Sequence, residues 1–185
     1  MAKINLPDIT VRDAQIRYPN LEGRATAFHS GGPDKRSFQL MLPEDVAAKM
    51  AEDGWNVKET RPRRDASDED RENFDPRPYI DVAASWKFER MAPKIRLITS
   101  TVQRMLTEDT AFLVDQAEIV RIDLTINPSA WEVGEKSGIK AYLKEAFITI
   151  HESELEKEYN HIPLEGTTAL SDGPKFTAEY TDTEF

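Results

Sequence analysis

The stretch GIKAYLKEAFITIH, residues 138–151, alternates polar and apolar side chains over most of its length. Successive side chains of a strand point to opposite faces, so Lys140, Tyr142 and Lys144 share one face. The opposite face carries the apolar residues Ile139, Ala141, Leu143 and Phe147. The pattern predicts a β-strand with one face in the core and one face that carries two lysines around a tyrosine.

Further strand-like runs precede this one, at 9–18, 37–42, 79–88, 94–99 and 118–127. Pro43 opens a short helix that Gly54 ends, and one or two helical turns follow Thr107. The strands do not alternate with helices as they do in a parallel α/β fold. The sequence therefore predicts an all-β domain of about five to seven strands, either an antiparallel barrel or a sandwich.

The charge distribution divides the chain into a body, residues 1–151, and an acidic tail, residues 152–185. The formal net charge is −10, yet residues 1–107 carry 18 Lys and Arg against 17 Asp and Glu. The segment 152–185 carries 2 basic residues against 9 acidic ones. This asymmetry is typical of a flexible acidic tail attached to a near-neutral body.

A second charged segment, TRPRRDASDEDRENFDPR, spans residues 60–77 and contains Phe74 as its one aromatic residue. A segment of this composition buries too little apolar surface to offset the entropy that ordering costs. We therefore expect a long mobile loop within the body.

The chain contains no cysteine, which excludes disulfides, thiolate zinc sites and cysteine nucleophiles and fits a reducing cytosol. No stretch approaches the roughly 20 apolar residues of a membrane-spanning helix, and the opening MAKINLPDIT lacks the apolar core of a signal peptide. We expect a soluble, intracellular protein without a membrane partner.

The face with two lysines around a tyrosine is the first candidate binding site. Lysines contact phosphates while a ring stacks on a base, which is how sequence-tolerant single-strand binders work. An ordinary solvated face is the alternative. Other basic residues that alternate with apolar ones, and aromatic residues at strand edges, extend the set. The candidate DNA-binding residues are Lys94, Arg96, Lys136, Lys140, Tyr142, Lys144, Trp55, Tyr79 and Trp131.

The final stretch, FTAEYTDTEF at 176–185, mixes acidic and aromatic side chains. A phenylalanine that follows acids suits a pocket with an apolar floor and a basic rim. An end without function is the alternative reading. The candidate partner-binding residues are Glu179, Tyr180, Asp182, Glu184 and Phe185.

Catalytic motifs fit poorly. GEKSGIK at 134–140 lacks the spacing of a phosphate-binding loop and leads into a strand instead of a helix. The three histidines show no metal-ligand spacing. Carboxylates such as Asp115 and Glu118 leave a metal-dependent nuclease open. We expect no catalytic residues and no cofactor.

Four ordered motifs and the tail resemble the single-stranded DNA-binding proteins of tailed bacteriophages. The motifs are GWNVK (54–58), KIRLIT (94–99), INPSAW (126–131) and GIKAYLK (138–144), and the acidic tail closes in Phe185. The resemblance implies an OB-like five-stranded antiparallel barrel with one or two short helices. It also implies sequence-independent binding of single strands during replication and recombination.

The same resemblance implies that the tail contacts replication proteins such as a polymerase or helicase and competes with DNA for the binding surface. It further implies a location in the host bacterial cytoplasm and allows for homodimers. Two alternatives stay open at this point. One is a non-enzymatic β-sandwich interaction module, such as a virion component, and the other is the metal-dependent nuclease.

Overall fold

The computed structural model describes residues 6–25, 35–100 and 102–152 of the 185-residue chain. The described residues form one sheet of nine strands: β1 (Ile9–Val11), β2 (Ile16–Asn20), β3 (Ser37–Met41), β4 (Lys58–Glu59), β5 (Pro78–Ala83), β6 (Lys94–Ile98), β7 (Gln103–Leu106), β8 (Ile119–Val133) and β9 (Lys136–Ile150). The helices are α1 (Glu44–Glu52), α2 (Asp68–Glu72), α3 (Leu113–Gln116) and the 3-10 helix η2 (Glu89–Met91). None of these helices in the described parts is long and apolar enough to cross a membrane. The predicted all-β class with short helices is confirmed.

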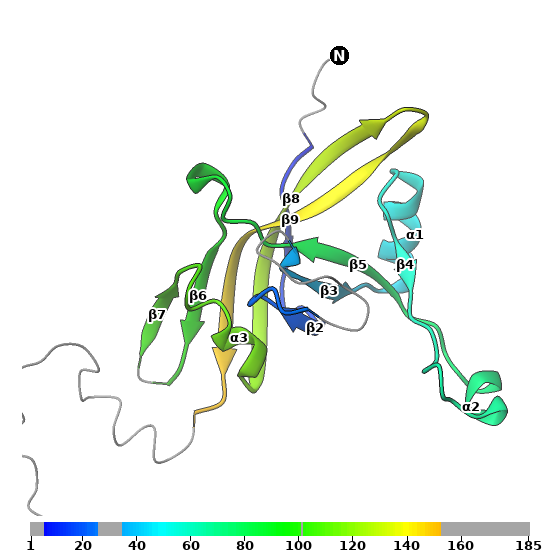
Figure 1. Cartoon of the computed structure of the whole chain (residues 1–185), viewed down its shortest axis with the longest axis horizontal. Coiled ribbons are helices and arrows are strands. Elements are labelled where there is room, and N and C mark those ends of the chain that lie inside the picture. The colour runs from blue at the N-terminus through cyan, green and yellow to red at the C-terminus, as the bar shows by residue number, and fades with distance from the viewer. Residues whose placement is uncertain (1–5, 26–34, 101, 153–185) are drawn as a thin grey trace, which may run out of the picture.

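The long hairpin of β8 and β9 forms the centre of the sheet (Figure 1). Its strands pair antiparallel along their whole length, from the pair Ile119–Ile150 to the pair Val133–Lys136 beside the tip. The first half of β9 pairs in parallel with β5, and its second half pairs in parallel with β6. Beyond β5 follow β3 and β2, while β1 pairs with the other edge of β8.

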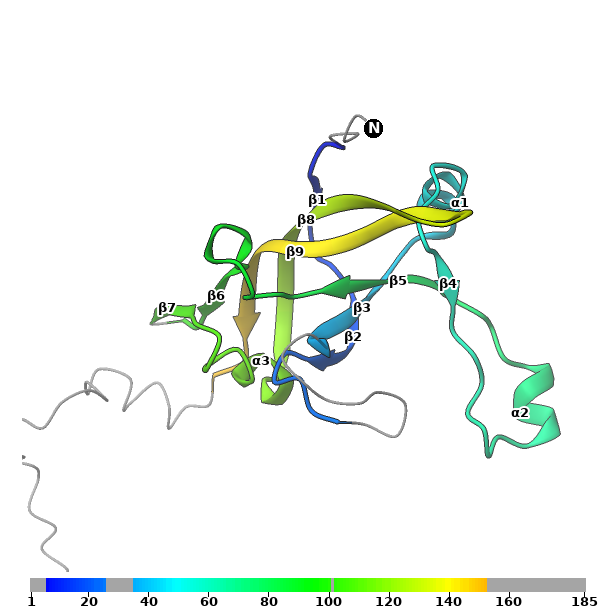
Figure 2. The ribbon, with the colours of Figure 1, turned by 45° about the horizontal axis from the view of Figure 1, so that its top comes forward.

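The two ends of this sheet meet because β1 and β2 are consecutive along the chain. The backbone N–H of Ala14 donates to the carbonyl of Ile122 at 2.7 Å, and that of Met41 donates to the carbonyl of Gln15 at 2.9 Å. The β1–β2 segment thereby bridges β8 and β3, so β1–β2, β3, β5, β9 and β8 curl into a partly open five-stranded barrel (Figure 2). This arrangement is the predicted OB-like barrel.

The barrel differs from the expectation in one pairing and in its additions. The β5–β9 pair is parallel, which the prediction of an antiparallel barrel did not contain. Parallel neighbours need a long crossover connection, and here the chain between β5 and β9 contains η2, the β6–β7 hairpin, α3 and β8. The β6–β7 hairpin extends the sheet along the second half of β9, and β4 adds a short pair on β5.

Apolar side chains that alternate along the barrel strands fill a single core. Its largest fully buried side chains are Leu21, Leu40, Ile80, Val82, Ile95, Val114, Ile122, Leu124 and Ile126. Each of the strands β3, β5 and β8 sends alternate residues inward, which leaves the intervening residues on an outer face. That outer face is available for binding.

The residues that follow helix α1 contact the outer half of the β8–β9 hairpin. Gly54, with a φ of 88°, follows the end of the helix, and its carbonyl accepts a hydrogen bond from the backbone N–H of Ile139 at 3.1 Å. This contact directs Trp55 into the core, where the residue is 9% exposed. The prediction that Trp55 offers its ring to DNA is therefore wrong, because the chain after α1 runs beside the buried Ile139.

A β-bulge in β9 reverses the strand's two faces. Leu143 lies opposite Ile126 and Glu145 lies opposite Thr125, so Lys144 is an extra residue without a counterpart on β8. Before the bulge the odd-numbered residues face the core, and after it the even-numbered ones do. Phe147 consequently lies on the outer face, which corrects the prediction that it shares the core face with Leu143.

The charged segment 60–77 has more structure than its composition predicts. It contains α2, whose first turn is capped by Ser67 Oγ accepting the backbone N–H of Asp70 at 3.1 Å. At the base of the segment, the N–H of Thr60 donates to the carbonyl of Arg77 at 2.9 Å. Figure 1 shows α2 projecting away from the barrel. Local capping and backbone pairing, which need little apolar burial, therefore place a short helix within the loop that the sequence predicts.

The ordered barrel continues one residue into the predicted tail. Glu152 is buried, and its carboxylate accepts a hydrogen bond from the backbone N–H of Ser100 at 3.2 Å. The remaining tail residues, 153–185, lie outside the described part of the chain.

Two tryptophans test the placement of α1 and of the hairpin. Trp55→Ala should lower the free energy of unfolding by about 3–5 kcal/mol, because it empties a core site. Trp131, which is 40% exposed, serves as the matched control. Trp131→Ala should cost clearly less in the same urea titration. Equal losses for the two variants would contradict the different burial of the two rings.

Candidate nucleic-acid interface

The outer half of the β8–β9 hairpin, which we call the arm, spans 127–133 and 136–142. Opposite residues of an antiparallel pair share a face, and the pairs here include Asn127–Tyr142, Ser129–Lys140 and Trp131–Gly138. Trp131, Lys140 and Tyr142 therefore lie on one face of the arm. The opposite face holds the buried residues Pro128, Ile139 and Ala141.

The arm face carries two aromatic rings, Trp131 and Tyr142, and the ammonium group of Lys140. The Nζ atom of Lys140 lies 5.1 Å from the centre of the Tyr142 ring. The Trp131 indole lies against Gly138, where an added methyl group would come within 3.1 Å of the ring. Glycine at this position therefore lets the indole lie across the neighbouring strand. The result is two aromatic surfaces with an ammonium group between them.

The face continues from the arm onto β5 and β4. Tyr142 lies beside Ala83 of β5, and Tyr79 and Asp81 share the outer side of that strand. Lys58 of β4 pairs with Tyr79 in register, and its Nζ binds the Asp81 carboxylate at 2.6 Å. The hydrogen bond to Asp81 raises the pKa of Lys58. We call Trp131, Lys140, Tyr142, Tyr79 and Lys58 the platform.

Four of the five platform residues are among the candidates predicted from the sequence, and Lys58 is not. The motif GWNVK could have indicated Lys58, because this lysine follows Trp55 by three residues and begins a strand. It was missed because only the pairing with β5 places Lys58 beside Tyr79.

Lys94 and Arg96 lie on the same outer side but farther along β9. They pair in parallel register with Glu145 and Phe147, beyond the bulge. The guanidinium of Arg96 lies 5.1 Å from the centre of the Phe147 ring, a second contact between a cation and an aromatic ring. Lys136 lies at the tip of the arm, opposite Val133. The structure thus places these three basic residues beyond the two ends of the platform.

Lys144 differs from the other predicted lysines because it already has a close acidic partner. Its Nζ forms an ion pair with Asp8, whose other carboxylate oxygen accepts a hydrogen bond from Asn127 Nδ2 at 2.8 Å. The hydrogen bonds from Lys144 and then Asn127 hold the pKa of Asp8 below its ordinary value. A phosphate at Lys144 would have to compete with a carboxylate that is ionised at neutral pH.

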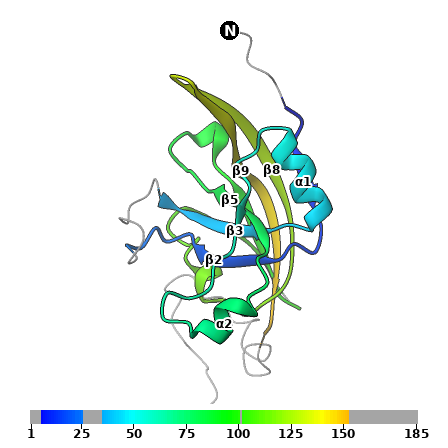
Figure 3. The same ribbon diagram turned by 90° about the vertical axis from the view of Figure 1, so that its right-hand side faces the viewer.

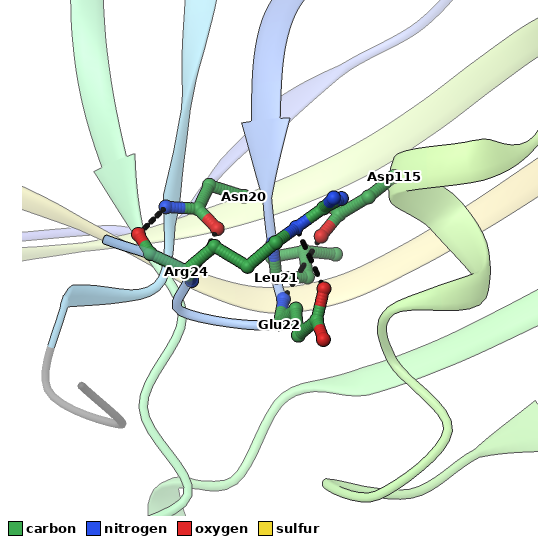
Figure 4. A network of polar contacts seen from close by, with 5 residues as sticks. All are labelled: Asn20, Leu21, Glu22, Arg24 and Asp115. Atoms are coloured by element: carbon green, nitrogen blue, oxygen red, sulfur yellow. Dashed lines mark hydrogen bonds and ion pairs between the residues drawn. The ribbon is translucent and has the colours of Figure 1, made fainter. Parts of the chain in front are cut away.

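The carboxylates considered for a nuclease do not gather in the described residues. In that part of the chain, no group of three His, Asp or Glu side chains is arranged to hold a metal ion. Asp115 has a structural role instead: its two oxygens accept the backbone N–H groups of Leu21 and Glu22 at 2.8 and 2.9 Å (Figure 4). It fixes the chain after β2 against the end of α3.

Comparison with known families identifies the class to which this protein belongs. The family model described as "Putative phage ssDNA-binding domain" matches residues 1–183. The chain belongs to this family. It is a phage single-stranded DNA-binding protein, and the resemblance seen in the sequence is confirmed. The expected binding of single-stranded DNA is confirmed with it.

Two solved structures are similar to this phage single-stranded DNA-binding protein. The single-stranded DNA-binding protein from bacteriophage Enc34 in complex with ssDNA is 14% identical, with a TM-score of 0.46, and the match covers 79% of this chain and 88% of that one. A C-terminal truncation of the Enc34 protein is 15% identical, with a TM-score of 0.45, covering 79% and 87%. A search of curated proteins found no match.

The arm face generates a test at Tyr142. If the ring stacks on a base, Tyr142→Ala should weaken binding of oligothymidine by about 1–3 kcal/mol, or roughly 5- to 150-fold in Kd. Tyr142→Phe keeps the ring and should bind like the wild type. Fluorescence anisotropy measures both, and urea unfolding should show little change. Normal binding by Tyr142→Ala together with a large loss of stability would mean that the ring is structural.

Proposed function

We propose that this protein coats single-stranded DNA without sequence preference by stacking bases on the platform and pairing phosphates with Lys140 and other basic residues of the outer face. The observation that carries the proposal is the arm face, where Trp131, Lys140 and Tyr142 lie together and the Lys140 ammonium sits 5.1 Å from the Tyr142 ring. Every base has an aromatic face and every nucleotide a phosphate, so these contacts tolerate any sequence.

The position of the platform within the barrel supports the proposal. OB folds bind oligonucleotides on the face of their second and third strands and on the loops that join strands one to two and four to five. In this barrel the second and third strands are β3 and β5, and the connection of the fourth to the fifth is the tip of the β8–β9 hairpin. Tyr79 of the platform lies on β5, and Trp131, Lys140 and Tyr142 lie on the arm. Figure 3 shows the ribbons of β3, β5 and the β8–β9 hairpin.

The biological setting is part of the same proposal. The protein acts by binding alone, without a catalytic residue or a cofactor, and protects single strands during phage DNA replication and recombination. It does so in the host bacterial cytoplasm. The family membership supports a DNA-binding role in phage. Homodimers are a further expectation, which analytical ultracentrifugation with and without oligonucleotide would test.

The decisive comparison uses one labelled single strand and a duplex of equal length, with and without magnesium. We expect strong binding to the single strand and weak binding to the duplex. The affinity should fall with salt, with a log–log slope of about −0.7 for each phosphate neutralised. Oligonucleotides of different sequence should bind alike.

The other outcomes of this experiment favour the alternatives. Cleavage that requires magnesium would support the metal-dependent nuclease. Equal binding of duplex, or binding that salt does not affect, would overturn contact through stacked bases and phosphates. No binding of either DNA would support an interaction module such as a virion component.

We also propose that the acidic segment 152–185 contacts replication proteins and competes with DNA for the basic residues of the face. The support is its composition, with 2 basic residues against 9 acidic ones. A tethered segment acts at an effective concentration on the order of millimolar. The acidic and aromatic candidates within it are Glu179, Tyr180, Asp182, Glu184 and Phe185.

Removal of residues 163–185 tests both parts of this proposal. The variant 1–162 should bind single-stranded DNA more tightly than the full chain, most clearly at low salt where screening is weakest. It should also lose capture of the phage or host polymerase or helicase. A chain that lacks only Phe185 should keep its DNA affinity but lose partner capture. Unchanged DNA affinity in 1–162 at low salt would exclude competition.

A further inference from the structure

Tyr18 combines an exposed ring with a strained backbone. The residue is 69% exposed, more than Trp131, and its φ is 51°. A bulky residue in this left-handed conformation is strained. Such strain persists only where the surrounding structure fixes it, and it is concentrated at binding sites. Tyr18 is not one of the platform residues.

A β-bulge produces the unusual conformation. Arg17 lies opposite Gln39 and Asn20 lies opposite Ser37, so two residues of β2, Tyr18 and Pro19, face one residue of β3. Bulges of this kind change the direction of a side chain relative to the regular strand. Here the bulge leaves the Tyr18 ring in solvent instead of packing it against the sheet.

The chain after the bulge is held firmly, as Figure 4 shows. Asn20 exchanges two hydrogen bonds with the backbone of Arg24, at 3.0 and 2.8 Å. Leu21 is 1% exposed, and its N–H and that of Glu22 both bind the Asp115 carboxylate. These contacts fix the backbone that follows Tyr18, so the ring is presented from a rigid support.

Arg17 and Tyr18 form a pair of a cation and an aromatic ring, as Lys140 and Tyr142 do on the arm. We call each of these two pairs a unit. The guanidinium of Arg17 lies 5.2 Å from the centre of the Tyr18 ring, close to the 5.1 Å between Lys140 and Tyr142. Arg17 is exposed and shares the outer side of the sheet with its partner Gln39. A cation beside an exposed ring can contact a phosphate while the ring stacks on a base.

A line of paired residues runs across the sheet from Tyr142 to Asn20, two residues after Tyr18. Tyr142 lies beside Ala83, Ala83 opposite Ser37, and Ser37 opposite Asn20. The two middle residues, Ala83 and Ser37, have small side chains. Strands β9 and β2 are three strand spacings apart along the sheet. At about 4.8 Å per spacing, this is roughly 14 Å.

We propose that Arg17 and Tyr18 form a second stacking site for the bound single strand, which crosses the sheet from Tyr142 over Ala83 and Ser37 to β2. The proposal rests on the proposed function and adds the direction of the DNA to it. The competing path follows β9 past the bulge toward Lys94 and Arg96.

The first test removes the Tyr18 ring with a residue that tolerates the left-handed backbone conformation at this position. Asparagine tolerates the left-handed conformation, so Tyr18→Asn should fold with wild-type stability or better. Its Kd for a 12-nucleotide oligothymidine should rise about 5- to 150-fold, as expected for one stacked base. Tyr18→Phe keeps the ring and should bind like the wild type. If Tyr18→Asn is unstable, Tyr18→Gly provides the same comparison.

A second test measures the phosphate contact. Arg17→Gln should lower the salt slope of binding by about 0.7, the share of one phosphate. Arg24→Gln is the matched control, because Arg24 follows the same strand but is already paired with Glu22 at 2.6 Å. The control should leave the slope unchanged.

Photo-crosslinking with bromodeoxyuridine in the oligonucleotide identifies the path directly. Cross-links at Tyr18 are expected beside those at the arm. Wild-type affinity of Tyr18→Asn, with cross-links confined to the arm and β6, would overturn the crossing path and leave the platform intact. If Tyr142→Ala also binds normally and no cross-link falls on the arm, the proposed function itself fails, which is a different result.

Discussion

The continuous pairing of β8 with β9 is the constraint on which the other features depend. These two strands are the only described ones that reach 15 residues. Their inner halves belong to the barrel, and β9 also supplies the edges on which β5 and β6 pair. Their outer halves project beyond the barrel as the arm. One hairpin therefore orders the core and carries the exposed rings, so the binding surface has the rigidity of the central sheet.

The bulge at Lys144 lets this single strand serve both purposes. A regular strand would keep the same parity throughout, and either Ala141 or Ala146 would then leave the core. The extra residue allows both to be buried while Tyr142 and Phe147 face outward. It also brings Lys144 to Asp8, which ties the segment before β1 to the hairpin.

Electrostatic balance explains how a chain of net charge −10 presents a surface to DNA. Several basic side chains of the outer face are held in place by single acidic partners, as Lys58 is by Asp81 and Lys144 by Asp8. Others, such as Lys140 and Arg96, lie over rings instead. A cation over a ring keeps its charge uncompensated, so it attracts phosphate better than one in an ion pair. The acidic excess of the chain is concentrated in 152–185.

The sequence by itself determined the all-β class and the shared face of Lys140 and Tyr142, because alternation along a strand is a local property. The alternation predicted the wrong face for Phe147, because the bulge at Lys144 shifts the strand by one residue. The composition of 60–77 did not predict the short helix α2, whose Ser67 cap needs little apolar burial. Only the tertiary structure decided that Trp55 is buried and that Lys58 and Arg17 lie on the outer face. Those positions depend on pairing between segments far apart in sequence, and no local pattern records which strand lies next to which.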